Sequence, residues 1–219
     1  MPSSRSGLNR RALLALNAAA LATAFAVAPA RAAEDGPAKV PLAQLLAPQA
    51  LPDLWLGDAK APVTIVEYAS MTCSHCAHFM EKTFPRLKVD YIDKGKVRYA
   101  LREFPLDPLA AAGAMLARCS GDKREAVVEL LFQTQNSWAF VQNPLEALTA
   151  TLKQTGMSQS AFEACLNDEP LFKNIDAMRQ QGQTTFGISA TPTFFINGDK
   201  RSGDIPAEDL DAVLAPYLK

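Results

Sequence analysis

The chain has 219 residues, 48% of them hydrophobic, and a formal net charge of −1 at pH 7. This length is sufficient for a full hydrophobic core, and it fits one domain with an insertion or two small domains. The charge is balanced and there is no polybasic stripe, which argues against a nucleic-acid-binding protein.

Residues 1–32 have the pattern of a signal peptide. Two adjacent arginines, Arg10 and Arg11, precede an apolar run from Ala12 to Val27, and small residues follow, so cleavage after Ala32 is expected. The run is shorter than the roughly 20 residues that a membrane-spanning helix needs, which disfavours an uncleaved anchor. The twin arginines leave export by Sec or by Tat open. The sequence therefore predicts export, with a bacterial periplasm as the natural destination.

The next 70 residues predict an arm followed by a strand, a helix and a second strand. Residues 33–57 are rich in proline and alanine, which predicts an extended arm or a strand edge. The short apolar run at 63–68 predicts the first core strand. From 74 to 92 apolar side chains recur at helical spacing, and Pro85 predicts a kink near the middle of this helix. Alternating residues at 96–102 predict the second strand.

The rest of the chain predicts a block of helices, a hairpin and a closing helix. From 109 to 182 the periodicity is helical throughout, with a last helix at about 170–182. A strand is predicted at 193–196, followed by a tight turn at Asn197-Gly198 and a helix at 207–218. This order indicates an α/β protein in which a helical insertion separates a β-α-β unit from a β-β-α unit.

The segment Cys73-Ser74-His75-Cys76 directly follows the first strand and opens the first helix. Two thiols at this spacing can form a small disulfide, and the free N–H groups of a helix N-terminus stabilise whichever sulfur becomes a thiolate. Such a pair is suited to disulfide exchange. The alternative, a structural zinc site, needs four ligands, and no second pair of cysteines or histidines at metal-ligand spacing follows.

All four cysteines lie beyond the predicted signal peptide. An even number of cysteines in an oxidising compartment favours disulfides. Adjacency makes Cys73–Cys76 the first pair, which leaves Cys119 with Cys165 as a structural disulfide inside the helical block. That bond would stabilise the fold by about 4 kcal/mol in the chain-entropy description. Two buried free thiols are the alternative for the second pair.

Two separated motifs resemble the DsbA-type thiol–disulfide oxidoreductases. One is the segment 63–106, with its paired cysteines and Arg102-Glu103-Phe104-Pro105-Leu106, and the other is Ala190-Thr191-Pro192-Thr193-Phe194-Phe195-Ile196-Asn197-Gly198. The resemblance implies a thioredoxin fold with an inserted α-helical domain. The thioredoxin domain would then comprise 58–107 and 184–219, with the insertion at 108–183.

The resemblance also implies roles for four residues. Cys73 would be the exposed attacking thiol and Cys76 the more buried resolving thiol. Pro192 would follow a cis peptide bond and bring Thr191 beside the active-site disulfide. The main chain of Thr191 could then bind an extended substrate by short strand-like pairing.

Two further residues are candidates for tuning the thiols. Glu67 matches an acidic position that lies under the disulfide in this family, where a buried carboxyl could relay a proton to Cys76. The alternative is a glutamate at a strand end that faces water. The imidazole of His75 could stabilise the Cys73 thiolate. Ser74 replaces the proline usual in the family, and Thr191 is also found in reductases and isomerases of the wider superfamily.

We therefore expect a periplasmic, monomeric dithiol oxidase that donates the Cys73–Cys76 disulfide to exported polypeptides during their folding. A quinone-linked membrane protein would reoxidise it, and no organic cofactor or metal is implied. A reductase or isomerase on the same scaffold is the nearest alternative. A metal-handling module that uses Cys73, His75, Cys76 and His78 and a catalytically idle binding module are alternatives from other classes.

Overall fold

The computed structural model describes residues 37–218. The signal peptide predicted for 1–32 and the start of the predicted arm lie outside these residues. Within the described range, no helix is both long and apolar enough to cross a membrane.

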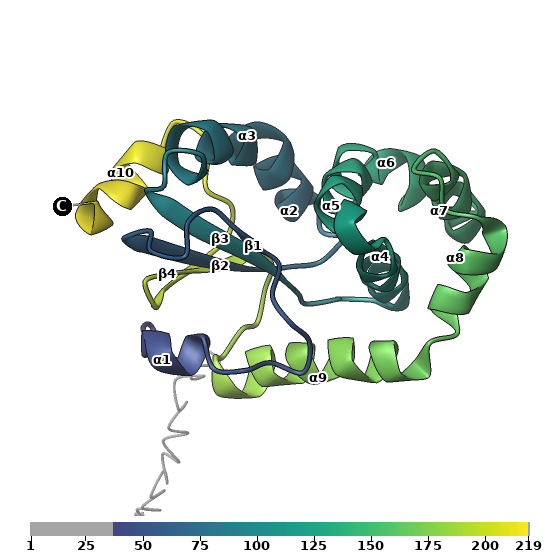
Figure 1. The fold of residues 1–219 in the computed structure, drawn as a ribbon, viewed down its shortest axis with the longest axis horizontal. Coiled ribbons are helices and arrows are strands. Elements are labelled where there is room, and N and C mark those ends of the chain that lie inside the picture. The colour runs from purple at the N-terminus through teal and green to yellow at the C-terminus, as the bar shows by residue number, and fades with distance from the viewer. Residues whose placement is uncertain (1–36, 219) are drawn as a thin grey trace, which may run out of the picture. The chain divides into compact units, whose positions relative to one another are not determined.

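The centre of the fold is a five-stranded sheet with the order β1-β3-β2-β4-β5 (Figure 1). The strands are β1 (Trp55–Leu56), β2 (Val63–Ala69), β3 (Val97–Glu103), β4 (Thr193–Ile196) and β5 (Asp199–Ser202). β2 and β3 are parallel, and the other neighbours are antiparallel. All seven residues of β2 are buried, as expected for a central strand covered on both faces. The strands predicted at 63–68, 96–102 and 193–196 are confirmed.

The turn between β4 and β5 is the tight hairpin that the sequence predicts. Asn197 and Gly198 have φ angles of 48° and 91°, the left-handed conformations that a two-residue hairpin loop requires. Gly198 also lies against the arm, because a Cβ atom there would be 2.1 Å from the carbonyl oxygen of Val40. The turn therefore needs glycine both for its conformation and for its contact.

The helix predicted at 74–92 is a series of four helical segments. They are α2 (Ser74–His78), a π-helical turn η1 (Phe79–Thr83), α3 (Phe84–Leu87) and a second π-helical turn η2 (Lys88–Ile92). Pro85 has no N–H to donate to the preceding turn, which explains a widened turn just before it. The second π-helical turn has no such sequence signal and was not predicted.

Six α-helices connect β3 to β4, with one short 3-10 turn among them. They are α4 (Pro108–Cys119), η3 (Gly121–Lys123), α5 (Arg124–Gln133), α6 (Gln135–Trp138), α7 (Pro144–Lys153), α8 (Gln159–Leu166) and α9 (Glu169–Thr185). Three of these helices begin with a side-chain cap from Asp107, Ser158 or Asp168, as expected at helix N-termini. The helical periodicity predicted for 109–182 is confirmed.

The closing helix and the N-terminal arm each differ from the prediction in one detail. The closing helix is shorter than 207–218, comprising α10 (Leu210–Leu214) and the 3-10 turn η4 (Ala215–Tyr217). It begins later because the N–H of Asp209 bonds to the carbonyl of Pro206 and closes a turn there. The arm contains one helical turn, α1 (Leu42–Leu45), which is too short to show a periodicity in the sequence.

The helices cover both faces of the sheet (Figure 1). The segments from α2 to η2 and α10 lie on one face, and α1 and part of α9 lie on the other. Alternation along β2 sends Ile65 toward the first face, in the larger core, and Val66 and Tyr68 toward the second. Glu67 has the same parity as Ile65 and therefore lies on the face that α2 covers.

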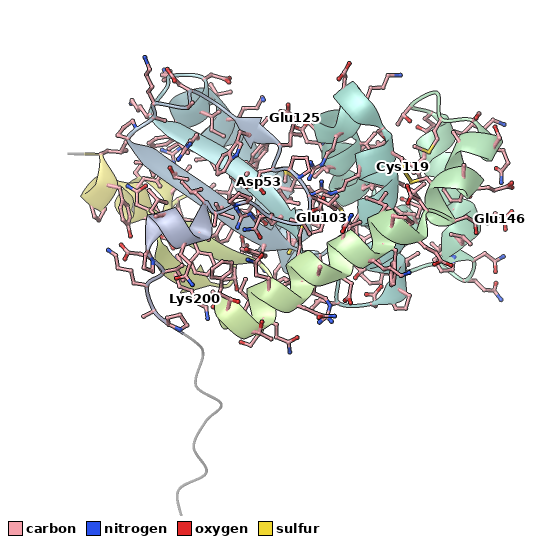
Figure 2. The ribbon with its side chains drawn as sticks, turned by 60° about the horizontal axis from the view of Figure 1, so that its bottom comes forward. Asp53, Glu103, Cys119, Glu125, Glu146 and Lys200 are labelled. Carbon is pink, nitrogen blue, oxygen red and sulfur yellow. A yellow bond between two sulfur atoms is a disulfide. The ribbon has the colours of Figure 1, made fainter. Side chains whose placement is uncertain are left out.

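A buried cluster of charges joins the sheet to the helices. Glu103 at the end of β3 accepts hydrogen bonds from Arg118 on α4 and Arg124 on α5. The neighbouring Arg102 makes a two-point bond to Asp53 of the arm, at 2.9 and 2.8 Å. Figure 2 shows Glu103 and Asp53 near the junction between the sheet and the helices.

Candidate functional site

The two closely spaced cysteines lie where β2 leads into α2. Cys73 is the N-cap residue of α2 and is half-buried, whereas Cys76 is fully buried one turn later. Both are free thiols in this structure. The Thr191–Pro192 peptide bond is cis, and the Cys73 sulfur lies 3.2 Å from the carbonyl oxygen of Thr191. Two segments 118 residues apart in the chain thus meet at one sulfur atom.

Hydrogen bonds to the Cys73 sulfur lower the pKa of this thiol to about 5. The largest contribution is the S–H of Cys76, and burial opposes it. Interaction with Thr191 also lowers the pKa, as do the backbone N–H groups of Cys76 and His75. Cys73 is therefore a thiolate at neutral pH, as a helix N-terminus favours.

The pKa of Cys76 is raised well above its usual value. Burial is the largest cause, because it disfavours a charged sulfur. The hydrogen bond to Cys73 and the negative charge of Glu67 act in the same direction. The reduced pair is thus one accessible thiolate and one buried thiol, and only the thiolate is ready to attack a disulfide at neutral pH.

This difference predicts how the reduced protein reacts with iodoacetamide. Only the thiolate reacts, so the rate at Cys73 should be nearly constant from pH 9 to pH 6 and fall about tenfold per pH unit below about 5. The rate is measured by mass spectrometry of quenched samples. In the Cys73→Ser variant the remaining thiol, Cys76, should not react below pH 9. A midpoint near 9 for Cys73 would contradict the assignment.

Glu67 is a core residue and does not face water. Its Oε2 accepts a hydrogen bond from the hydroxyl of Tyr99, and its Oε1 is buried without a partner among the described residues. Burial raises the pKa of Glu67 to about 8, the hydrogen bond from Tyr99 lowers it, and the negative charges of Cys73 and Asp204 raise it. The carboxyl is therefore mostly protonated at neutral pH and interacts electrostatically with both cysteines.

The two histidines of this segment lie on its exposed side. The side chain of His75 is exposed, and this residue lowers the pKa of Cys73 through its backbone N–H. The side chain of His78 is 53% exposed, and its Nδ1 contacts Oδ2 of Asp204 at 2.5 Å. Among the described residues, no group of three or more His, Cys, Asp or Glu side chains could hold a metal ion.

Three residues that contact the site, or interact with it electrostatically, were not predicted from the sequence. Tyr99 and Asp204 interact with Glu67, and Gln135 on α6 donates from Nε2 to the carbonyl oxygens of Met71 and Cys73, at 2.9 and 3.0 Å. Gln135 is 62 residues from Cys73 in the chain, so no local pattern could indicate it. Its bonds fix the main chain on both sides of the strand-to-helix turn.

Cys119 and Cys165 form a disulfide between α4 and α8. Their Cα atoms are 6.2 Å apart, and 46 positions separate them in the sequence. Figure 2 shows Cys119 among the helices, away from the sheet. This disulfide therefore belongs to the helical segment and not to the pair of reactive thiols.

Comparisons with known proteins agree with this geometry. Residues 49–215 match the sequence profile of the thioredoxin family. The crystal structure of alpha-DsbA1 from Wolbachia pipientis is 32% identical, with a TM-score of 0.74, and the match covers 82% of this chain and 96% of that one. BdbD from Bacillus subtilis, 22% identical with a TM-score of 0.65, shares the fold over 76% of this chain and 92% of its own.

A Rickettsia typhi protein named as a protein-disulfide oxidoreductase is 35% identical over 148 residues. The match covers 67% of this chain and 55% of that protein. The chain thus spans about half the length of the curated relatives from Rickettsia.

Proposed function

The chain belongs to the DsbA-type thiol–disulfide oxidoreductases of the thioredoxin family, and from this premise we propose that it oxidises pairs of cysteines in other proteins. The observation that carries the proposal is the hydrogen-bonded environment of Cys73. A stabilised thiolate favours the reduced form of the pair, so the Cys73–Cys76 disulfide is a strong oxidant. The same stabilisation disfavours a reductase, which must give its electrons away.

The reaction proceeds through a mixed disulfide. A substrate thiolate attacks the Cys73 sulfur, the Cys73–Cys76 bond breaks, and Cys76 leaves with the electron pair and takes up a proton. A second substrate thiolate then attacks the substrate sulfur of the mixed disulfide, and Cys73 leaves as a thiolate. The substrate loses two electrons, and the two sulfurs of the enzyme gain them.

Thr191 is well placed to hold an extended substrate chain. Its carbonyl oxygen lies 3.2 Å from the Cys73 sulfur, so its main chain is next to the reacting atom. Main-chain pairing with Thr191 would bring a substrate cysteine to Cys73 without selecting a sequence. Glu67 would supply the proton that the leaving Cys76 needs, because its carboxyl is protonated and interacts with that sulfur.

The partners follow from this chemistry. Oxidation of protein thiols is useful in an oxidising compartment, and the N-terminal pattern favours export to the periplasm. Exported polypeptides are therefore the proposed substrates, and a quinone-linked membrane protein is the proposed reoxidant. We propose a monomer that uses no organic cofactor or metal.

The proposal is tested by equilibrating the protein with glutathione redox buffers and measuring the reduction potential of Cys73–Cys76. The expected potential lies well above the glutathione poise, because the reduced form is stabilised. The Cys119→Ser/Cys165→Ser double variant serves as the control for the second disulfide. A potential near or below about −270 mV, that of thioredoxin, would overturn the oxidase assignment in favour of a reductase.

A further inference from the structure

The helices between β3 and β4 contact three successive residues of the turn that leads from β2 into α2. These residues are Met71, Thr72 and the reacting Cys73, and the contacts come from α4, from the residue that caps it and from α6. None of the contacts is made to a sulfur atom of the cysteine pair, so the exchange steps do not account for them. They hold the turn on which the reaction depends.

Gln135, on α6, holds the main chain on both sides of Thr72. It is 3% exposed, and its Nε2 donates to the carbonyl oxygens of Met71 and Cys73 at 2.9 and 3.0 Å. A carbonyl oxygen can only accept a hydrogen bond, so the amide turns its nitrogen toward both and uses its two N–H groups. The carbonyl of Cys73 also accepts the first bond of α2, from the N–H of Ala77 at 3.1 Å. Gln135 therefore fixes this carbonyl from outside the helix that begins there.

Trp138 anchors α6, and with it Gln135, beside the same turn. It lies one helical turn after Gln135, is fully buried, and donates from Nε1 to the carbonyl oxygen of Leu131 at 2.8 Å. Its ring packs on Gly113 of α4, where an added Cβ atom would be 3.5 Å from the ring and 3.2 Å from Cβ of Met71. Trp138 and Met71 thus pack on the same glycine, so a shift of α6 would disturb the turn as well.

A third contact joins Thr72 to the start of α4. The hydroxyl of Thr72 donates to Oδ2 of Asp107 at 2.5 Å, and Oδ1 of Asp107 caps α4 by accepting from the N–H of Ala110. This bond is exposed and holds a side chain, whereas Gln135 holds the main chain of the reacting residue itself. Gln135 is therefore the contact with the most direct effect on Cys73.

We propose that Gln135 is a positioning residue for disulfide exchange, which holds Cys73 in the N-cap conformation that turns its side chain toward the first N–H groups of α2. Cys73 has φ and ψ angles of −80° and 119°, the extended conformation typical of an N-cap residue. The ψ angle sets the direction of the Cys73 carbonyl, and this carbonyl is the group that Gln135 binds. The N–H groups of His75 and Cys76 that lower the pKa of Cys73 depend on this conformation.

The inference rests on the proposed function, in which an ionised Cys73 makes the disulfide a strong oxidant. The test is Gln135→Met, which keeps the length of the side chain and removes both donors. Because a less firmly held Cys73 loses part of its thiolate stabilisation, the midpoint of its iodoacetamide profile should rise from about 5 by about one pH unit. The reduced form is then about tenfold less favoured at pH 7, which lowers the reduction potential by about 30 mV.

Thr151→Val is the matched control for a lost buried hydrogen bond. Thr151 lies on α7, is 7% exposed, and donates from its hydroxyl to the carbonyl oxygen of Ala147 in the same helix at 2.9 Å. Urea unfolding should show lower stability for both variants, whereas only Gln135→Met should shift the Cys73 midpoint and the potential. If Gln135→Met does not fold, Gln135→Glu replaces it: a carboxyl keeps at most one donor, so the midpoint should rise in the same direction.

Each outcome decides the inference. A folded Gln135→Met or Gln135→Glu protein with the wild-type midpoint and potential would show that the amide only satisfies two buried carbonyls, and the inference would be wrong. Equal shifts in Thr151→Val would also overturn it, because the effect would then come from lost stability of the helices. A wild-type potential near or below that of thioredoxin contradicts the proposed function instead, and the Cys73 midpoint of the variants still decides the role of Gln135.

Discussion

Replacing Cys73 with serine is expected to abolish disulfide exchange, whereas replacing Cys76 with serine is expected to trap substrates on the protein. Cys73 is the accessible thiolate, so its loss should lower the rate of dithiol oxidation by at least about 10³-fold. The Cys76→Ser protein keeps the attacking sulfur and loses the buried thiol that would release a trapped partner. It should therefore accumulate mixed disulfides through Cys73.

The two variants are compared by non-reducing electrophoresis and mass spectrometry after incubation with the disulfide-linked dimer of a single-cysteine peptide, from which the Cys73 thiolate displaces one peptide as a thiolate and keeps the other as a mixed disulfide. The rate at which each variant oxidises a dithiol peptide is measured in parallel. The control is the Cys119→Ser/Cys165→Ser double variant, which should still exchange disulfides because that bond lies between α4 and α8. Mixed disulfides on Cys76 in the Cys73→Ser protein, at a comparable yield, would reverse the assigned roles.

The features of the fold that depend only on residues close together in the sequence were predictable. The strands at 63–68 and 193–196 are short apolar runs with clear ends, and the turn at Asn197-Gly198 has the residues that its conformation requires. The spacing of Cys73 and Cys76 likewise places both on one helical turn whatever surrounds them. Short stretches of sequence were therefore sufficient to predict these elements.

The environment of the thiols was not predictable in this way, because it depends on contacts between distant segments. The sequence left open whether Glu67 faces water, and only the packing of α2 over the sheet buries it. Tyr99 is 32 positions from Glu67, and Gln135 is 62 positions from Cys73. These contacts decide which sulfur ionises, so the site's electrostatics required the tertiary structure.

The charged cluster around Glu103 is a further tertiary feature with a large expected effect on stability. Glu103 is 2% exposed, and its two oxygens accept bonds of 2.6–2.8 Å from Arg118 and Arg124. Burial lowers the pKa of Arg124, and the charge of Glu103 is the largest influence that opposes this. Without Glu103 the two guanidinium groups would remain largely buried, close together and without their shared anion.

Glu103→Ala is therefore expected to lower the free energy of unfolding by about 3–5 kcal/mol, the usual cost of removing one partner from a buried ion pair. Urea unfolding of the protein with both disulfides oxidised measures this change.

The matched control is Glu169→Ala, which removes a carboxylate paired with Lys173 where both side chains are largely exposed. This variant should lower the free energy of unfolding by no more than about 0.5 kcal/mol. Because Arg118 and Arg124 lie on α4 and α5 while Glu103 ends β3, the difference between the variants measures how strongly this cluster holds the helices to the sheet. Equal costs for the two variants would mean that apolar packing alone holds them together.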